Sequence, residues 1–210
     1  MKVNTLRLRA MIGWLGMLLP WIVAVIYIAM GKGFPPSISA TWFERATCTP
    51  FMIILGSASL LLMSYRGYEK IDDILLTFAG IAGLLICLFP CAAESGKIGM
   101  FMVDSAISGK VHNISAIVFF GLLSYNSFFL FTKSTGEMTT KKKIRNIIYR
   151  ICGVGMIGSF AIMLFPSFPS RIWLVEAIAL FFFGVSFLTK ADVYPWLFCD
   201  TPFVDDEGDA

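Results

Sequence analysis

The chain has 210 residues, of which 57% are hydrophobic and only 15% are charged, and its formal net charge is +3. Soluble domains carry about 25% charged residues, so this composition excludes an ordinary soluble enzyme. The small net charge does not indicate a nucleic-acid partner, because the basic residues lie mostly in short loops, where they set the orientation of the helices. The composition is typical of a chain that lies in a lipid bilayer.

Six apolar stretches follow one another along the chain. Each is about as long as a helix needs to cross a hydrocarbon layer of ~30 Å at 1.5 Å per residue. The stretches are residues 12–30, 50–65, 74–90, 113–132, 147–165 and 172–189. None alternates with the period of two that a barrel strand shows, and backbone groups in lipid must find partners within their own helix. We predict an all-α, six-helix transmembrane domain over residues 1–190 and an acidic tail over residues 191–210.

Basic residues are distributed unevenly between the two sides of this predicted bundle. Twelve of the 17 Lys and Arg residues fall on the side of the termini and five on the other. By the positive-inside rule, both termini should be cytoplasmic and the protein should be a multi-pass protein of the cell membrane. The basic run 141–145 is read as an orientation signal or, alternatively, as a site for anionic lipid headgroups.

Two external connections, residues 31–49 and 91–111, are longer than a simple return requires. Long loops of this kind are often functional, so we expect the functional site on this side. Residues 98–107 are expected to form a short helix in the membrane interface. The polar residues of these loops that we assign to a ligand site are Ser37, Ser39, Glu44, Arg45 and Asp104.

Short motifs resemble a known family. They are residues 37–39 after a proline, the basic turn around Gly67, residues 111–116 and residues 173–176. They are similar to the damage-regulated autophagy modulator family, which includes a Golgi protein needed to remodel the fatty acids of GPI anchors. The chain looks most similar to its bacterial branch. The resemblance implies six spans, cytoplasmic termini and, from the eukaryotic members, a part in lipid handling, but no established reaction.

Glu176 lies five residues after Arg171, so a helix would carry its carboxylate about 7.5 Å into the membrane. A carboxylate costs ~2.5 kcal/mol or more at the bilayer centre and less near its surface, so it needs a polar partner. His112, the one histidine of the chain, is expected at the start of the fourth helix on the same side. We hypothesise that Glu176 meets this helix end. The two residues are the catalytic candidates; a helix cap and a structural hydrogen bond are the alternatives.

Two helix N-termini, those of the fourth and sixth helices, are expected to face outward beside Lys110 and Arg171. Positive helix ends with basic side chains suit an anion such as a lipid phosphate. Asn113 and Ser115 complete the predicted ligand site near His112. Neither a nucleotide-binding motif nor a cluster with metal-ligand spacing occurs, so we expect no cofactor and no metal.

Cys48 and Cys91 both fall at external helix ends. In an oxidising compartment they would be able to form a disulfide, and otherwise they are buried free thiols.

The favoured function is binding or organising membrane lipid through a polar pocket at the external ends of the fourth and sixth helices. A lipid-modifying enzyme that uses His112 and Glu176 is the first alternative. A transporter or channel for small solutes is the second.

Overall fold

The computed structural model describes residues 5–67, 69–93, 95–133 and 139–194. Within these ranges it contains six helices that are long and apolar enough to cross a membrane. They are α1 (Thr5–Ala29), α2 (Arg45–Met63), α3 (Lys70–Leu88), α4 (Ser105–Tyr125) with the π-helical η2 (Asn126–Leu130), α5 (Thr140–Gly158) with the 3-10 helix η3 (Ser159–Leu164), and α6 (Arg171–Lys190). From residue 195 onward, the predicted acidic tail lies outside the described residues.

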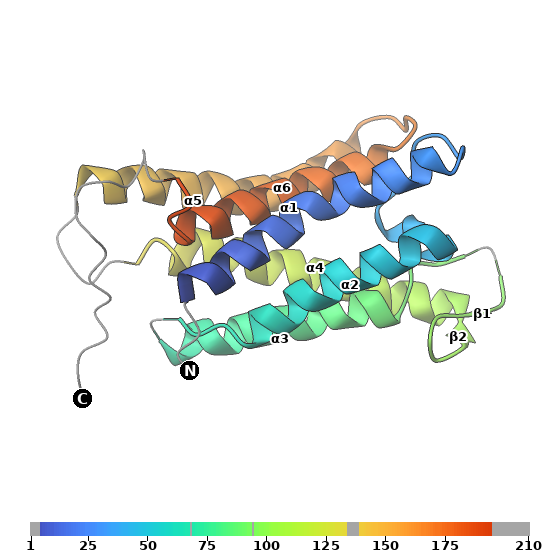
Figure 1. The fold of residues 1–210 in the computed structure, drawn as a ribbon, viewed down its shortest axis with the longest axis horizontal. Helices are drawn as coiled ribbons and strands as arrows, with labels where there is room; N and C mark the ends of the chain where they lie inside the picture. The colour runs from blue at the N-terminus through green and yellow to red at the C-terminus, as the bar shows by residue number, and fades with distance from the viewer. Residues whose placement is uncertain (1–4, 68, 94, 134–138, 195–210) are drawn as a thin grey trace.

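The helices form a ring in chain order. Each packs against the next one in sequence, and α6 closes the ring against α1. The start of α1 and the end of α6 lie at one end of the bundle, which we call the terminal end (Figure 1). The connections α1–α2, α3–α4 and α5–α6 lie at the opposite end, the loop end. The ring therefore brings all the long connections together.

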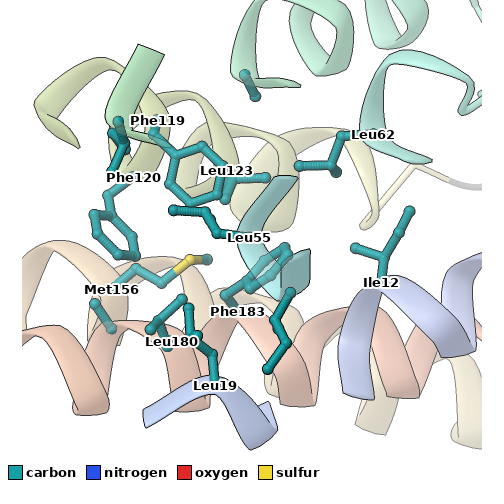
Figure 2. Packing of buried hydrophobic residues seen from close by; sticks show 14 of the residues in the cluster. Ile12, Leu19, Leu55, Leu62, Phe119, Phe120, Leu123, Met156, Leu180 and Phe183 are labelled. Carbon is teal, nitrogen blue, oxygen red and sulfur yellow. The ribbon is translucent and has the colours of Figure 1, made fainter. Parts of the chain in front are cut away.

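Large apolar side chains fill the centre of the ring. Leu55 of α2, Phe119 and Leu123 of α4, Met156 of α5 and Phe183 of α6 meet there, as Figure 2 shows. The α1 and α6 backbones also approach closely, because a Cβ atom on Gly184 would lie only 2.9 Å from the carbonyl oxygen of Gly13. Small residues at such a crossing are typical of helices that pack in lipid.

The outer surface of the bundle is also apolar. Trp21, Val25 and Ile117 keep 57%, 65% and 67% of their surface exposed. A monomeric soluble protein rarely exposes a continuous apolar surface, because water penalises it. The outward faces of these helices suit lipid better than water.

A β-hairpin stands at the loop end, where the sequence predicts a short helix over residues 98–107. Strands β1 (Lys97–Ile98) and β2 (Val103–Asp104) pair antiparallel, with Lys97 opposite Asp104. Gly99 has a φ of +78°, a conformation that glycine adopts at no steric cost. The predicted interfacial helix is therefore wrong, because this glycine turns the chain back on itself.

Helix α4 begins at Ser105, earlier than the apolar stretch 113–132 predicts. The carboxylate of Asp104 accepts a hydrogen bond of 2.9 Å from the backbone N–H of Ala106 and so caps the helix. His112 consequently lies about two turns inside α4 and not at its N-terminus, which corrects the sequence-based placement.

Candidate functional site

A cavity of about 470 Å³ lies in the loop-end half of the bundle. This volume is within the range of about 300–1,000 Å³ that small-molecule sites occupy. Most of the lining is aliphatic or aromatic and comes from α1, α2, α4, η3 and α6. Among the lining residues of the described chain, the only side chains with nitrogen or oxygen atoms are Ser39, His112, Asn113 and Glu176.

The cavity reaches the outer surface of the bundle. Three of its lining residues, Ile117 of α4, Met163 of η3 and Ile172 of α6, are 67%, 41% and 48% exposed on the outer surface. These three residues place an opening of the cavity between α4 and the η3–α6 corner, and the exposed Asn113 also lines the cavity.

Glu176 fastens the α1–α2 connection to α6. Its Oε1 accepts a hydrogen bond of 2.7 Å from Ser39 Oγ, and its Oε2 accepts one from the backbone N–H of Ile38. These donors lie at the start of the 3-10 helix η1 (Ser39–Phe43), where backbone N–H groups have no partner within the helix. Nearby, the backbone N–H of Trp173 donates to the carbonyl of Pro36 at 3.2 Å. The connection is thus held against the first two turns of α6.

His112 reaches the same serine from the other side. Its Nδ1 lies 2.9 Å from the carbonyl oxygen of Phe89, and its Nε2 lies 3.0 Å from Ser39 Oγ. A carbonyl only accepts hydrogen bonds, so Nδ1 carries a proton and Nε2 faces the serine. Glu176 and His112 therefore approach the same point, with Ser39 between them as the shared partner.

The sequence predicts Ser39 only as one of several polar loop residues and does not indicate its position between Glu176 and His112. Its two partners are 137 and 73 residues away along the chain. No spacing rule reaches that far. The one available signal was the short polar motif between the prolines and Trp42, which identifies the loop but not the contact.

Residue Cys91 lies close to this site. Burial and the charge of Glu176 raise the pKa of its thiol to about 11. Cys48 and Cys91 are both free thiols, and Cys48 Sγ lies 3.7 Å from Met52 Sδ. The disulfide weighed from the sequence is not formed in this structure.

Three other loop residues assigned to the ligand site lie away from the cavity lining. Ser37 is buried, and its Oγ accepts a hydrogen bond of 2.8 Å from the backbone N–H of Ala40. Glu44 forms an ion pair with Lys32. Arg45 begins α2 as an exposed residue. These residues shape or flank the connection and do not face the cavity.

Of the helix residues assigned to the ligand site, some line the cavity and others do not. Asn113 lines the cavity next to His112, whereas Lys110 is exposed and Ser115 is buried outside the lining. Arg171 donates a hydrogen bond of 2.6 Å to the carbonyl oxygen of Phe165 and so holds the turn before α6. Asp104 is likewise occupied as the cap of α4 and does not contact His112.

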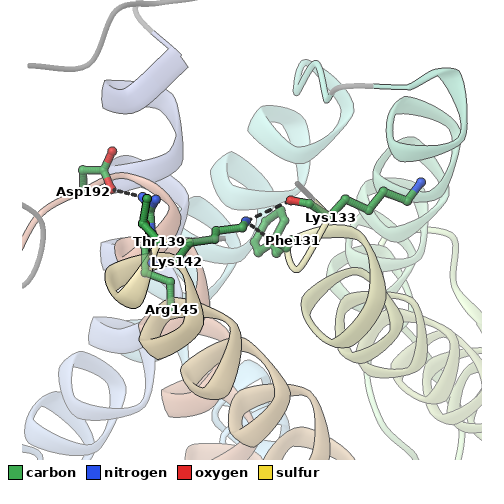
Figure 3. A network of polar contacts seen from close by, with 6 residues as sticks. All are labelled: Phe131, Lys133, Thr139, Lys142, Arg145 and Asp192. Carbon is green, nitrogen blue, oxygen red and sulfur yellow. Dashed lines mark hydrogen bonds and ion pairs between the residues drawn. The ribbon is translucent and has the colours of Figure 1, made fainter. Parts of the chain in front are cut away.

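The terminal end holds a different polar cluster, shown in Figure 3. Lys142 Nζ donates to the carbonyl oxygens of Lys133 and Phe131 at 2.8 and 3.4 Å. Arg145 Nη1 lies 3.2 Å from Asp192 Oδ1. Burial raises the pKa of the Asp192 carboxyl, and the neighbouring Arg145 opposes this shift. Of the basic run 141–145, Lys142 is thus buried, and its ammonium group contacts carbonyl oxygens.

No group of three or more His, Cys, Asp and Glu residues that could hold a metal ion occurs within the described ranges.

No family model, no curated protein and no solved structure matches the chain. The resemblance to the autophagy modulator family therefore rests on the short sequence motifs alone.

Proposed function

We propose that the protein is an integral membrane protein that binds a membrane amphiphile. The apolar part of the ligand occupies the cavity, and its polar group lies against Glu176, Ser39 and His112. The observation that carries this proposal is a side-opening apolar cavity whose few polar groups are gathered on its wall. Sites for small molecules have this composition, mostly apolar with a few polar groups that set the orientation.

The apolar outer surface supports membrane insertion, since all six long helices carry enough apolar residues to cross a bilayer. The basic excess at the terminal end supports cytoplasmic termini and an external loop end. In this orientation the cavity opens toward the outer leaflet. The partner is therefore a lipid or another amphiphile of that leaflet. Membership of the autophagy modulator family, which this chain resembles, would agree with a part in lipid handling.

A cavity-filling variant tests this proposal. Ala116 lines the cavity, whereas Val118 on the same helix is 42% exposed on the outer face. Full-length protein in nanodiscs would be titrated with a fluorescent 16-carbon fatty acid. We expect Ala116→Phe to weaken binding at least tenfold and Val118→Phe, which adds a ring to the outer face, to leave it unchanged.

Equal binding by Ala116→Phe and the wild type would contradict the proposal. Melting temperature and gel-filtration profile of both variants show whether the added ring has disturbed the fold. A graded series through Ala116→Val and Ala116→Leu keeps the test decisive if Ala116→Phe does not fold, because affinity should fall with added volume.

A further inference from the structure

The hydroxyl of Ser39 lies between two groups that are each able to take or give a proton. Ser39 Oγ is 2.7 Å from Glu176 Oε1 and 3.0 Å from His112 Nε2. Both distances lie within the range of about 2.6–3.2 Å over which a base takes a proton from a nucleophile. Ser39 is only partly buried and lines the cavity. Its oxygen can therefore be reached by whatever occupies the cavity.

The proton count of this chain of three residues follows from the contacts. Because His112 Nδ1 already donates to Phe89, only Nε2 can exchange a proton with Ser39. The serine hydroxyl has a single proton and can give it to one neighbour only. If neither Glu176 nor His112 Nε2 held a proton, one of the two contacts would bring two lone pairs together. At least one proton must therefore be held by Glu176 or by His112 Nε2.

When one such proton is present, one of the two residues Glu176 and His112 is an acid and the other is a base. When Ser39 donates to Glu176, His112 Nε2–H donates to Ser39, and the imidazolium and carboxylate lie on opposite sides of the hydroxyl. A proton shift along the chain exchanges the two roles. This arrangement gives Ser39 a base and an acid at once, which a nucleophile in acyl transfer requires.

We propose that Ser39 is the nucleophile of an esterase site and that the substrate is an ester-linked lipid. This inference rests on the proposed function, because it uses the same cavity for the acyl chain. Ser39 Oγ bonds to the carbonyl carbon of the ester while its proton passes to Glu176. The bond between that carbon and the alcohol oxygen then breaks, and the alcohol leaves with the proton of His112 Nε2.

Water completes the cycle. A water molecule attacks the acyl carbon and gives a proton to His112 Nε2, which is now neutral. Ser39 Oγ leaves and takes back the proton held by Glu176. Glu176 is then a carboxylate again and His112 an imidazolium, as before the reaction. The net reaction is ester and water to fatty acid and alcohol. Asn113, an exposed residue that also lines the cavity, carries the amide N–H group that we assign as the donor to the carbonyl oxygen that becomes charged.

Fluorophosphonates test this proposal directly, because they form a phosphorus–oxygen bond with an activated serine and release fluoride. Full-length protein in nanodiscs would be treated with a fluorophosphonate probe, and the modified peptide identified by mass spectrometry. We expect a single adduct on Ser39 and none in Ser39→Ala. With p-nitrophenyl octanoate as substrate, we expect one equivalent of p-nitrophenol to appear as a burst.

Ser108→Ala is the matched control. Ser108 is also a loop-end serine with a neighbouring acceptor, since its Oγ donates to the carbonyl of Pro90 at 2.7 Å, but it does not line the cavity. This variant should keep the adduct on Ser39. Glu176→Gln can still accept from the Ser39 hydroxyl but loses the base, so labelling should slow at least tenfold.

The fatty-acid titration on the same wild-type preparation separates the two proposals. If the protein binds the fatty acid but Ser39 is not labelled, or if Ser39→Ala is labelled as fast as the wild type, the nucleophile assignment is overturned and the binding function stands. If the wild type neither binds the fatty acid nor is labelled, both proposals fail.

Discussion

The two ends of the bundle both bury charged side chains, yet they use them differently. At the loop end, Glu176, Ser39 and His112 bond to one another across three separate chain segments and line a cavity. At the terminal end, buried cations are held by carbonyl oxygens and aromatic rings. Lys142 shows the first mode (Figure 3). Lys190, whose Nζ lies 5.2 Å from the centre of the Phe131 ring, shows the second.

This contrast shows that burial of a charge does not by itself indicate a site. Lys and Arg have long apolar stems that pack against a hydrophobic interior while the charged group reaches an acceptor or a ring face. Arg9, whose guanidinium lies 5.4 Å from the Tyr65 ring, is a further example. None of these cations lines the loop-end cavity. We therefore infer that the terminal cluster stabilises helix ends, and that Glu176, Ser39 and His112 contact a ligand.

The largest effect on stability should come from removing the carboxylate of Glu176. In Glu176→Leu, the backbone N–H of Ile38 loses its acceptor, whereas the Ser39 hydroxyl can still donate to His112 Nε2. A buried donor without a partner costs about 1–3 kcal/mol. Because Ile38 is buried, we expect the free energy of unfolding to fall by up to about 3 kcal/mol. Thermal unfolding in detergent measures this, with Glu176→Gln as the milder control. Wild-type stability in Glu176→Leu would show that the α1–α2 connection is held by other contacts.

Removing the buried ammonium group of Lys142, as in Lys142→Met, should affect only the terminal end of the bundle. The carbonyl oxygens of Phe131 and Lys133 lose their donor, which should lower the free energy of unfolding by about 2 kcal/mol. Because the cavity is distant from this cluster, fatty-acid affinity and Ser39 labelling should not change. A drop in fatty-acid affinity of more than threefold in the folded variant would mean that the two ends are coupled and that the terminal cluster is not purely structural.

Cys91 reports on the charge of Glu176. Burial and that charge raise the pKa of the thiol to about 11, and only the thiolate reacts with alkylating reagents. In Glu176→Gln the midpoint of the pH–rate profile for Cys91 alkylation should move to lower pH, so the rate at pH ~8.5 rises a few-fold. Glu44→Gln, which removes a carboxylate paired with Lys32, is the control and should leave the profile unchanged. An unmoved profile in Glu176→Gln would argue for an uncharged Glu176.

The smallest expected effect is a change in how the melting temperature depends on pH, caused by Asp192. Burial raises its pKa above the unfolded value of about 3.9, so the folded state favours the protonated carboxyl. The stability that this carboxyl contributes is therefore present below pH ~4 and lost as the pH rises through its folded pKa. Asp192→Asn should remove that loss, so the melting temperature of the variant minus that of the wild type should increase slightly from pH ~4 upward. A difference that shrinks with pH would mean that the pair with Arg145 outweighs burial.

The sequence predicts the number and order of the helices well, because hydropathy reports the apolar part of each one. It places their starts too late. Helices α2, α3, α4 and α5 begin with polar or charged turns at Arg45, Lys70, Ser105 and Thr140. Backbone hydrogen bonding continues through such turns although they are not apolar, so a hydropathy criterion cannot detect them.

The candidate site was predictable only in part. A carboxylate at Glu176 is costly in an apolar helix, and this cost correctly indicated that a polar partner was needed. The partner itself depends on how the α1–α2 connection folds back onto α6, which is a long-range property. Loop polarity alone suggested Glu44 and Asp104 equally, yet local ion pairing and helix capping occupy them.

The most direct test of the side-opening cavity is photo-crosslinking with a fatty acid that carries a diazirine on its chain. In nanodiscs, we expect adducts to concentrate on Ile117, Met163 and Ile172 around the opening, and to disappear from them in Ala116→Phe. Adducts spread evenly over the outer surface, with Val25 of α1 labelled as strongly and no change in Ala116→Phe, would contradict the account.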